Sequence, residues 1–176
     1  MKNLEIKARC KDHAAAVKAL KNLNAEYKGV LRQRDVYFRV DSGRLKLRSI
    51  NGSEHQLIYY RRPDKKSARY SNYFLEMIRR PVEAEKLLQQ SLGKLVIVNK
   101  IRKLYIYENV RIHLDTVRGL GGFIEIEVVC KTAGETRLAA KKMQMLLKEL
   151  GIRHNEQIRY SYSDLIMQNK TKQKIK

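Results

Sequence analysis

The sequence has little of what marks a secreted protein, a zinc protein or a membrane protein. Its 176 residues include two cysteines, Cys10 and Cys130, and no Cys–His spacing typical of a metal site. No apolar run approaches the length that crosses a bilayer, and the charged N-terminus does not resemble a signal peptide. We therefore expect a reduced, cytoplasmic protein without a membrane partner, whose two cysteines pack against strands.

Acidic residues are also scarce, because 18 Asp+Glu stand against 38 Lys+Arg and give a net charge of +20. Residues 170–176 hold four lysines and no acid, so removing those four charges from +20 still leaves +16. A basic domain implies an anionic partner, namely nucleic acid, an anionic membrane or a small polyphosphate. We predict that residues 1–169 form a single domain and that residues 170–176 are a disordered basic tail.

Residues 110–130 alternate between apolar and polar side chains on both sides of a Gly-Leu-Gly-Gly turn. This period of two predicts an antiparallel hairpin. One face of the hairpin then carries Arg111, His113, Asp115, Glu125 and Glu127. The three carboxylates repel one another unless a cation lies among them, and a divalent metal would suit them. A solvated outer face would show the same alternation, so both interpretations stay open, and we interpret His113 as a hydrogen-bonded structural histidine.

The rest of the chain repeats two patterns. Alternation and turn residues predict further strands at residues 3–10, 33–40, 44–50, 55–62, 70–78 and 96–107. Amphipathic spacing with capping residues predicts helices after Asp12, from Pro81 to Gly93, over residues 133–150 and near residues 163–168. The expected inner faces of the second and third helices are Val82, Leu87, Leu88 and Leu92, and Leu138, Met145, Leu146 and Leu150.

About eight locally joined strands with few helices favour an α+β fold with an antiparallel sheet or closed barrel. The charged strand faces would point outward if apolar faces filled the barrel. Amphipathic helices need apolar surface to cover, which favours helices on the outside and charges around an inner channel. Buried charges need partners. A channel with more cations than carboxylates suits a triphosphate together with one or two Mg²⁺ or Mn²⁺ ions.

Several segments combine in a specific order and spacing. They are N-L-E-I-K-A-R at 3–9, Q-R-D-V-Y-F at 33–38, G-R-L-K-L-R at 43–48, L-I-Y-Y-R-R-P at 57–63, Lys100 and Arg102 before Tyr105, R-I-H-L-D-x-V-x-x-L-G-x-F-I-E-I-E at 111–127, and Y-S-D-L at 162–165. Together they resemble the CYTH superfamily over nearly the whole chain. That superfamily joins class IV adenylyl cyclases and thiamine triphosphatases in a triphosphate tunnel fold.

The resemblance implies an eight-stranded antiparallel tunnel that binds a triphosphate and a divalent metal, Mg²⁺ or Mn²⁺. It implies metal ligation by Glu5, Asp115, Glu125 and Glu127, and catalysis by Glu5, Lys7, Glu125 and Glu127. It implies phosphate binding by Lys7, Lys46, Arg48, Arg62, Lys100, Arg102 and Arg111. Alternation does not choose between Arg61 and Arg62, and the family's Tyr-x-Arg spacing favours Arg62. The family's opening Glu-x-Glu-x-Lys reads Asn3-Leu4-Glu5-Ile6-Lys7 here, so an amide replaces the first acid.

The expected function is metal-dependent hydrolysis of tripolyphosphate, a nucleoside triphosphate or thiamine triphosphate. One alternative is an adenylyl cyclase that makes cyclic AMP and pyrophosphate from ATP. Another is a non-enzymatic binder of polyphosphate or RNA. The favoured partner is a small molecule that contains a triphosphate, nucleic acid is disfavoured, and a homodimer stays open.

Overall fold

The computed structural model describes residues 2–61 and 68–174. Along the chain the elements are β1 (Lys2–Arg9), α1 (His13–Asn22), β2 (Glu26–Phe38), β3 (Arg44–Ile50), β4 (Glu54–Arg61), β5 (Arg69–Met77), α2 (Pro81–Leu92), β6 (Lys94–Tyr107), β7 (Val110–Val117), β8 (Gly121–Cys130), α3 (Ala133–Glu149), a 3₁₀ turn (His154–Glu156) and α4 (Tyr162–Lys174).

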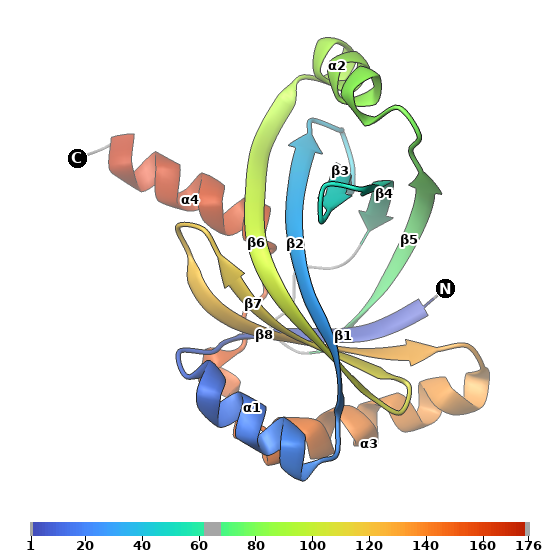
Figure 1. The fold of residues 1–176 in the computed structure, drawn as a ribbon, viewed down its shortest axis with the longest axis vertical. Helices are drawn as coiled ribbons and strands as arrows, with labels where there is room; N and C mark the ends of the chain where they lie inside the picture. Colours follow the sequence, from blue (N-terminus) through green and yellow to red (C-terminus); the bar gives the residue numbers. More distant parts are fainter. Residues whose placement is uncertain (1, 62–67, 175–176) are drawn as a thin grey trace.

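The eight strands form one closed antiparallel barrel in the order β1-β5-β4-β3-β2-β6-β7-β8. Strand β1 closes the barrel because it pairs with β5 on one edge and with β8 on the other. Strands β2 and β6 pair along most of their length and form a long curved wall (Figure 1). The predicted α+β barrel is therefore confirmed.

Strand β2 begins at Glu26, several residues before the predicted start. The register between β2 and β6 shifts between Tyr27 and Gly29, where Gly29 has a φ of 113°. Such an irregularity interrupts the alternation of side chains. The period of two was therefore visible only in the second half of the strand.

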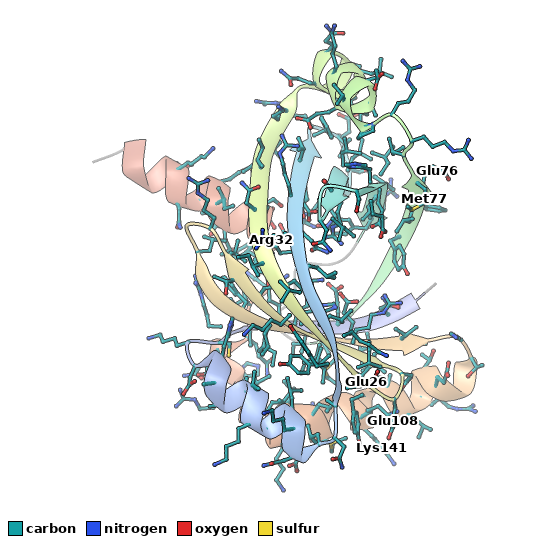
Figure 2. All side chains as sticks on the ribbon, in the orientation of Figure 1. Glu26, Arg32, Glu76, Met77, Glu108 and Lys141 are labelled. Carbon is teal, nitrogen blue, oxygen red and sulfur yellow. The ribbon has the colours of Figure 1, made fainter. Side chains whose placement is uncertain are left out.

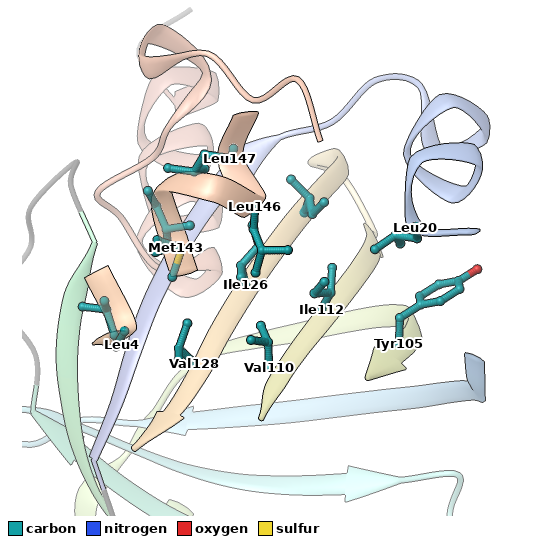
Figure 3. Close-up of a cluster of buried hydrophobic side chains, with 14 of the residues drawn as sticks. Leu4, Leu20, Tyr105, Val110, Ile112, Ile126, Val128, Met143, Leu146 and Leu147 are labelled. Atoms are coloured by element: carbon teal, nitrogen blue, oxygen red, sulfur yellow. The ribbon is translucent and has the colours of Figure 1, made fainter. Parts of the chain in front are cut away.

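The main hydrophobic core lies between the outer surface of the barrel and two helices. The outward side chains of β1, β7 and β8 pack against α1 and α3, as Figure 3 shows for Leu4, Val110, Ile112, Ile126, Val128, Leu20, Met143, Leu146 and Leu147. Figure 1 shows α1 and α3 together at the end of the molecule where β7 and β8 lie. Because the apolar faces point outward, the alternating polar faces of the same strands point into the barrel, as predicted.

Each predicted helix face is right only in part. Leu88 of α2 packs against a cluster of buried residues of the barrel. In α3, Leu146 is buried in the main core, and Met145 and Leu150 pack against that core. In α2, Val82 is 77% exposed and Leu87 is 65% exposed, and none of the described residues of this helix is buried. In α3, Leu138 is 61% exposed, whereas the buried residues are Ala139, Met143, Leu146 and Leu147. These four follow the spacing i, i+4, i+7 and i+8 that defines one helix face. The packing face therefore starts on a small alanine, which hydropathy alone does not favour.

Helix α4 continues through Lys174, into the segment for which a disordered tail was predicted. Its side chains Tyr162, Leu165, Ile166 and Met167 pack in the second hydrophobic cluster with residues of β6, β7 and β8. Both cysteines are free thiols, and Cys130 is buried in the main core, against which Cys10 packs. Among the helices described, none combines the length and the apolar content that a membrane crossing needs.

Candidate functional site

A cavity of about 770 Å³ lies inside the barrel, within the range of roughly 300–1,000 Å³ that ligand sites occupy. We call it the tunnel. Six cations line it, namely Lys7, Lys46, Arg48, Lys100, Arg102 and Arg111. Four carboxylates line it as well, namely Glu5, Asp35, Glu125 and Glu127. The structure therefore brings together every predicted site residue in the tunnel lining except Asp115, which is fully buried and bonded to lining residues, and Arg62.

Arg62 lies outside the described residues. Its neighbour Arg61 is exposed and donates hydrogen bonds to Tyr59 Oη at 2.7 Å and to Ser42 Oγ at 2.7 Å. Arg61 also lines a separate cavity near the start of α4. Alternation did not choose between Arg61 and Arg62 as the tunnel residue. The contacts of Arg61 favour a role outside the tunnel for this residue.

Lys46 and Arg48 on β3 face Asp35 on β2. Asp35 and Arg48 are directly paired across the two strands. Arg48 Nε donates to Asp35 Oδ1 at 2.7 Å and Arg48 Nη2 donates to Oδ2 at 2.8 Å, while Lys46 Nζ donates to Oδ2 at 2.9 Å. We call these three residues the Asp35 cluster. A fork-shaped guanidinium bound to a carboxylate by two parallel hydrogen bonds is held firmly in orientation.

Sequence reasoning missed Asp35, although the motif that contains it was recognised. Gln33, Asp35 and Tyr37 alternate along β2 and share its buried inner face. This alternation could have indicated that Asp35 points into the barrel. Its pairing with Arg48 depends on the register between strands, which alternation does not give. Burial alone would raise the pKa of Asp35, but Arg48 and Lys46 hold it well below its ordinary value. Burial, followed by the charge of Arg48, lowers the pKa of Lys46 to about 7.

Strands β6 and β7 repeat the same arrangement. Arg102 on β6 is directly paired with Asp115 on β7. Arg102 Nε donates to Asp115 Oδ1 at 2.7 Å and Nη2 donates to Oδ2 at 2.7 Å, while Lys100 Nζ donates to Oδ2 at 3.3 Å. We call these residues the Asp115 cluster. Burial, followed by the charge of Arg102, lowers the pKa of Lys100 to about 8.

Asp115 is fully buried, and its two oxygens accept hydrogen bonds from three side chains that line the tunnel. The third donor is Tyr162 Oη at 2.9 Å, from the start of α4. Burial alone would raise the pKa of Asp115, but Arg102 and Lys100 lower it. One lysine, one arginine and one tyrosine side chain therefore donate to Asp115 in the ligand-free protein, and its role as a metal ligand stays a prediction. We propose that Asp115 orients Lys100 and Arg102.

The remaining carboxylates gather where β1 pairs with β8. Glu5 is paired with Glu127, and Lys7 with Glu125. Glu125 accepts hydrogen bonds from Lys7 Nζ at 3.1 Å and from Arg102 Nη2 at 2.7 Å. Burial alone would raise the pKa of Glu125, but Lys7 and Arg102 hold it well below its ordinary value. Burial, followed by the charge of Glu125, raises the pKa of Glu127 to about 7. This part of the tunnel, defined by Glu5, Glu125 and Glu127, is called the acidic corner.

The potential metal-ligand atoms at the acidic corner fit a divalent cation. The ligand atoms offered by His113, Glu125 and Glu127 lie within 4.8 Å of one another. His113 Nδ1 and Asn3 Oδ1 are buried and have no hydrogen-bond partner among the residues that the structure describes. Burial and then Arg102 keep the pKa of His113 well below its ordinary value, so the neutral ring can offer a lone pair. Carboxylate and amide oxygens suit Mg²⁺ and Mn²⁺.

His113 was interpreted from the sequence as a structural histidine, and its position beside Glu127, with His113 Nδ1 to Glu127 Oε1 at 3.7 Å, was not foreseen. Asn3 was expected to enter the channel, and it does line the tunnel. Arg111 lies at an exposed part of the tunnel lining and is paired with Glu127 across β7 and β8.

The sequence matches the model of the CYTH domain family over residues 1–162. The chain belongs to the CYTH family. A Methanocaldococcus jannaschii protein that carries the provisional name adenylate cyclase is 29% identical over 177 residues, which cover 94% of this chain and 98% of that protein. Members of the CYTH family are enzymes that act on triphosphates, as triphosphatases or as cyclases, and use divalent metals.

Solved CYTH-like structures have the same fold. The PH1012 protein of Pyrococcus horikoshii has a TM-score of 0.82 and 24% identity, and the alignment covers 93% of this chain and 98% of that one. A Hippeastrum protein has a TM-score of 0.65 and 17% identity, with 94% of each chain covered. It is described as a provisional adenylyl cyclase with a dominant triphosphatase activity. At these identities the likeness shows the tunnel fold alone.

Proposed function

We propose that this CYTH protein is a divalent-metal-dependent triphosphatase that hydrolyses inorganic tripolyphosphate, a nucleoside triphosphate or thiamine triphosphate. The observation that carries the proposal is the division of one tunnel into two lysine–arginine clusters and one acidic corner. The clusters present cations for phosphate oxygens. The acidic corner presents carboxylates where a metal and a water molecule are needed.

The clusters are preorganised for phosphate. Asp35 and Asp115 fix Arg48 and Arg102 through Nε and Nη2. A guanidinium has five N–H donors, so further N–H groups of each arginine can still donate to a phosphate oxygen. Because the cations are already oriented, they need little rearrangement when a triphosphate binds. Each charge-assisted contact to phosphate contributes roughly 1.5–3 kcal/mol.

We propose that Glu5, Glu125 and Glu127 hold the Mg²⁺ or Mn²⁺ ion, with Asn3 and His113 as neutral donors beside them. A bound ion supplies neutralisation of phosphate charge and a lowered pKa of a coordinated water molecule. The Nζ atom of Lys7 donates to Glu125 and lies 4.0 Å from the ring centroid of Tyr162. The hydrogen bond to Lys7 orients the Glu125 carboxylate. We therefore propose Lys7 as a catalytic residue together with Glu5, Glu125 and Glu127.

A second candidate function is an adenylyl cyclase, in which the ribose 3′-hydroxyl attacks the α-phosphorus and pyrophosphate leaves. The name of the M. jannaschii relative favours it. The tunnel lining also includes aromatic and aliphatic residues that could contact a nucleobase, among them Tyr60, Tyr73, Phe74 and Leu104. Both reactions use the same phosphate-binding clusters, so only the products distinguish them.

The test is turnover of tripolyphosphate, ATP and thiamine triphosphate with Mg²⁺ or Mn²⁺, followed by identification of the products. We expect metal-dependent release of phosphate, with pyrophosphate as the second product from tripolyphosphate. Cyclic AMP and pyrophosphate from ATP would show the cyclase instead. Tight metal-independent binding of all three compounds without turnover would contradict both enzymes and leave a polyphosphate binder.

A further inference from the structure

The tunnel accounts for little of the positive charge of the chain. Its six described cations stand against five carboxylates, which are Glu5, Asp35, Glu125 and Glu127 in the lining and the buried Asp115 bonded to Arg102. The tunnel therefore contributes +1. Subtracting this from the net charge of +20 leaves +19 for the rest of the chain, or +18 if Arg62 is counted with the tunnel. A triphosphate in the tunnel does not explain why the rest of the protein is so basic.

A second concave site lies on the outer surface of the barrel. It has a volume of about 530 Å³ and crosses the wall formed by β3, β2, β6 and β7. Its residues on β2 are Arg32 and Arg34, which alternate with the buried Gln33 and Asp35. The side chains of Arg32 and Arg34 therefore point away from the tunnel. We call this site the outer groove. It is lined by Arg32, Gln33, Arg34, Ser49, Gly52, Asn99, Lys100, Ile101, Thr116 and Arg118, of which Lys100 also lines the tunnel.

Strand register arranges the outer groove in two rows across the sheet. In one row Arg34 is paired with Ser49 on β3 and with Asn99 on β6, whose carbonyl oxygen accepts from Arg118 N at 3.0 Å. In the other row Ile101 lies between Arg32 and Thr116. Rows two residues apart are separated by about 7 Å along a strand. The outer groove thus presents cationic and neutral hydrogen-bonding groups at regular intervals.

The arginines of the outer groove differ in their partners. Arg34 is bound by Glu85 of α2, with Nη1 to Oε2 at 2.7 Å and Nη2 to Oε1 at 3.0 Å. Arg32 and Arg118 are exposed and have no ion-pair partner within residues 2–61 and 68–174. None of the described residues that line the outer groove is acidic. Two arginines are therefore available to an external anion.

The chemistry of the outer groove matches a phosphodiester backbone. Arginine, serine, threonine and asparagine are the side chains that contact phosphate and sugar in protein–nucleic acid complexes. An anionic bilayer would require an apolar face that enters the interface, whereas the groove is concave and Ile101 is the one large apolar side chain among its described residues. No aromatic residue appears among those residues either. Recognition through stacked bases is therefore not expected.

We propose that the outer groove binds the phosphate backbone of a nucleic acid strand, without sequence preference and independently of the tunnel. The sequence analysis disfavoured nucleic acid as a partner, but the tunnel accounts for only +1 of the net charge of +20. Because the strand would bind outside the barrel and the triphosphate inside it, substitutions in the outer groove should leave the hydrolytic activity unchanged.

The test is fluorescence anisotropy of a labelled single-stranded RNA oligonucleotide at several salt concentrations. The variant is Arg32→Gln with Arg118→Gln, and the matched control is Lys141→Gln with Lys148→Gln, which removes the same charge from exposed positions on α3. Figure 2 shows Arg32 on β2 in the middle of the molecule and Lys141 near α3 at its lower end. We expect the groove variant to bind about tenfold more weakly. The slope of log K against log salt should fall in magnitude by about 1.4, because each single-strand phosphate contact contributes roughly 0.7.

The control variant should keep the wild-type slope, and both double variants should keep wild-type turnover of tripolyphosphate. An equal loss in both variants would show diffuse attraction and overturn the outer groove as a site. Loss of RNA binding in Arg48→Ala, with binding kept in the groove variant, would place the strand in the tunnel and overturn the proposal. Binding of the wild type to phosphatidylserine vesicles but not to RNA would overturn it in favour of a membrane surface. Failure of triphosphate turnover would leave the RNA result unaffected.

Discussion

The Asp35 and Asp115 clusters have the same construction and different neighbours. In each, a Lys-x-Arg segment faces an aspartate on the adjacent strand, and the arginine is directly paired with that aspartate. Lys46 of the Asp35 cluster lies 5.5 Å from the ring centroid of Tyr37 and 5.6 Å from that of Tyr60. In the Asp115 cluster, Arg102 also donates to Glu125 of the acidic corner at 2.7 Å.

This difference suggests a division of work along the tunnel. Both clusters can bind phosphate oxygens, but of the hydrogen bonds that the two clusters make within residues 2–61 and 68–174, only those of the Asp115 cluster reach a carboxylate of the acidic corner. We therefore expect the phosphoryl group that is attacked to lie beside Arg102, and the other phosphates to lie toward Arg48. The aspartates have a common role, because each offsets the charge of a buried arginine while the tunnel holds no anion.

The largest expected effect is the loss of an aspartate. Asp115→Ala leaves Lys100 and Arg102 buried without their main partner, which typically costs about 3–5 kcal/mol of unfolding free energy. Asp35→Ala should cost less, because Arg48 is more accessible than Arg102 and Asp35 does not also bind a tyrosine of α4. Urea unfolding measures both, with Asp41→Ala as the control at an exposed acid. If Asp115→Ala unfolds at the same urea concentration as Asp41→Ala, the aspartate does not stabilise the cluster.

Replacement of the arginines should weaken triphosphate binding. Arg48→Ala and Arg102→Ala each remove a charge-assisted phosphate contact, so affinity should fall about tenfold or more. The loss should be greater for Arg102→Ala, because it also leaves Glu125 and Asp115 with less neutralisation. Both variants should stay folded, since lost repulsion among the cations partly offsets the lost pairing. Calorimetry with tripolyphosphate measures the affinities, with Arg137→Ala on the surface of α3 as control. Unchanged affinity in a folded Arg102→Ala protein would contradict the division of work.

The two lysines should differ in their response to pH. The pKa values of Lys46 and Lys100 are about 7 and about 8, so Lys46 loses its proton first as pH rises. Metal-free affinity for tripolyphosphate should therefore fall from pH 6 to pH 8, by about tenfold per pH unit at most for one proton. Lys46→Arg should remove the part of this dependence near pH 7, because arginine stays charged. Calorimetry across this range provides the measurement, and an unchanged profile in Lys46→Arg would assign the titration to another group.

The same pKa values have a consequence for stability. Both folded-state pKa values lie below the ordinary value of 10.5, so the native state binds fewer protons than the unfolded state between about pH 7 and pH 10.5. The contribution of these lysines to the stability of the ligand-free protein therefore increases as pH rises through this window. A bound triphosphate should reduce the effect, because it favours the protonated lysines.

The smallest expected effect concerns Asn3. Asn3→Glu adds a carboxylate beside the acidic corner, so the midpoint of Mn²⁺ activation should move to a concentration a few-fold lower, a modest share of the roughly 1.4 kcal/mol that a tenfold change represents. Repulsion from Glu5, Glu125 and Glu127 opposes this gain, and the nearby cations should outweigh it. Gln144→Glu, at an exposed position of α3, adds the same charge elsewhere. An unchanged or higher midpoint for Asn3→Glu would show that residue 3 does not contribute to metal binding.

Much of this tunnel could be predicted because alternation fixes which residues share a strand face. Alternation put Lys46 and Arg48 on one face of residues 44–50, and Glu125 and Glu127 on one face of the hairpin. The structure places all four in the tunnel lining. The need of the helices for apolar surface then indicated which face points inward. Family resemblance was needed to select particular residues as metal or phosphate ligands.

Partners across strands could not be predicted from alternation. Asp35 and Arg48 become neighbours only through the register of β2 with β3, and Asp115 and Arg102 only through that of β6 with β7. Without the register, neither the bond between Arg102 and Asp115 nor the role of Asp35 could be foreseen. The exposed face of α2 could not be predicted either, because its position relative to the barrel depends on tertiary packing that hydropathy does not encode.

The most direct measurement compares tripolyphosphate hydrolysis by the wild type and by Glu127→Gln, with Glu149→Gln at an exposed position as control. We expect the wild type and the control to release phosphate and pyrophosphate in the presence of Mg²⁺ or Mn²⁺. Glu127→Gln should lose turnover by about 100-fold or more, while its metal-free affinity for tripolyphosphate stays the same or increases. Full metal-dependent turnover in Glu127→Gln would contradict the assignment of the chemistry to the acidic corner.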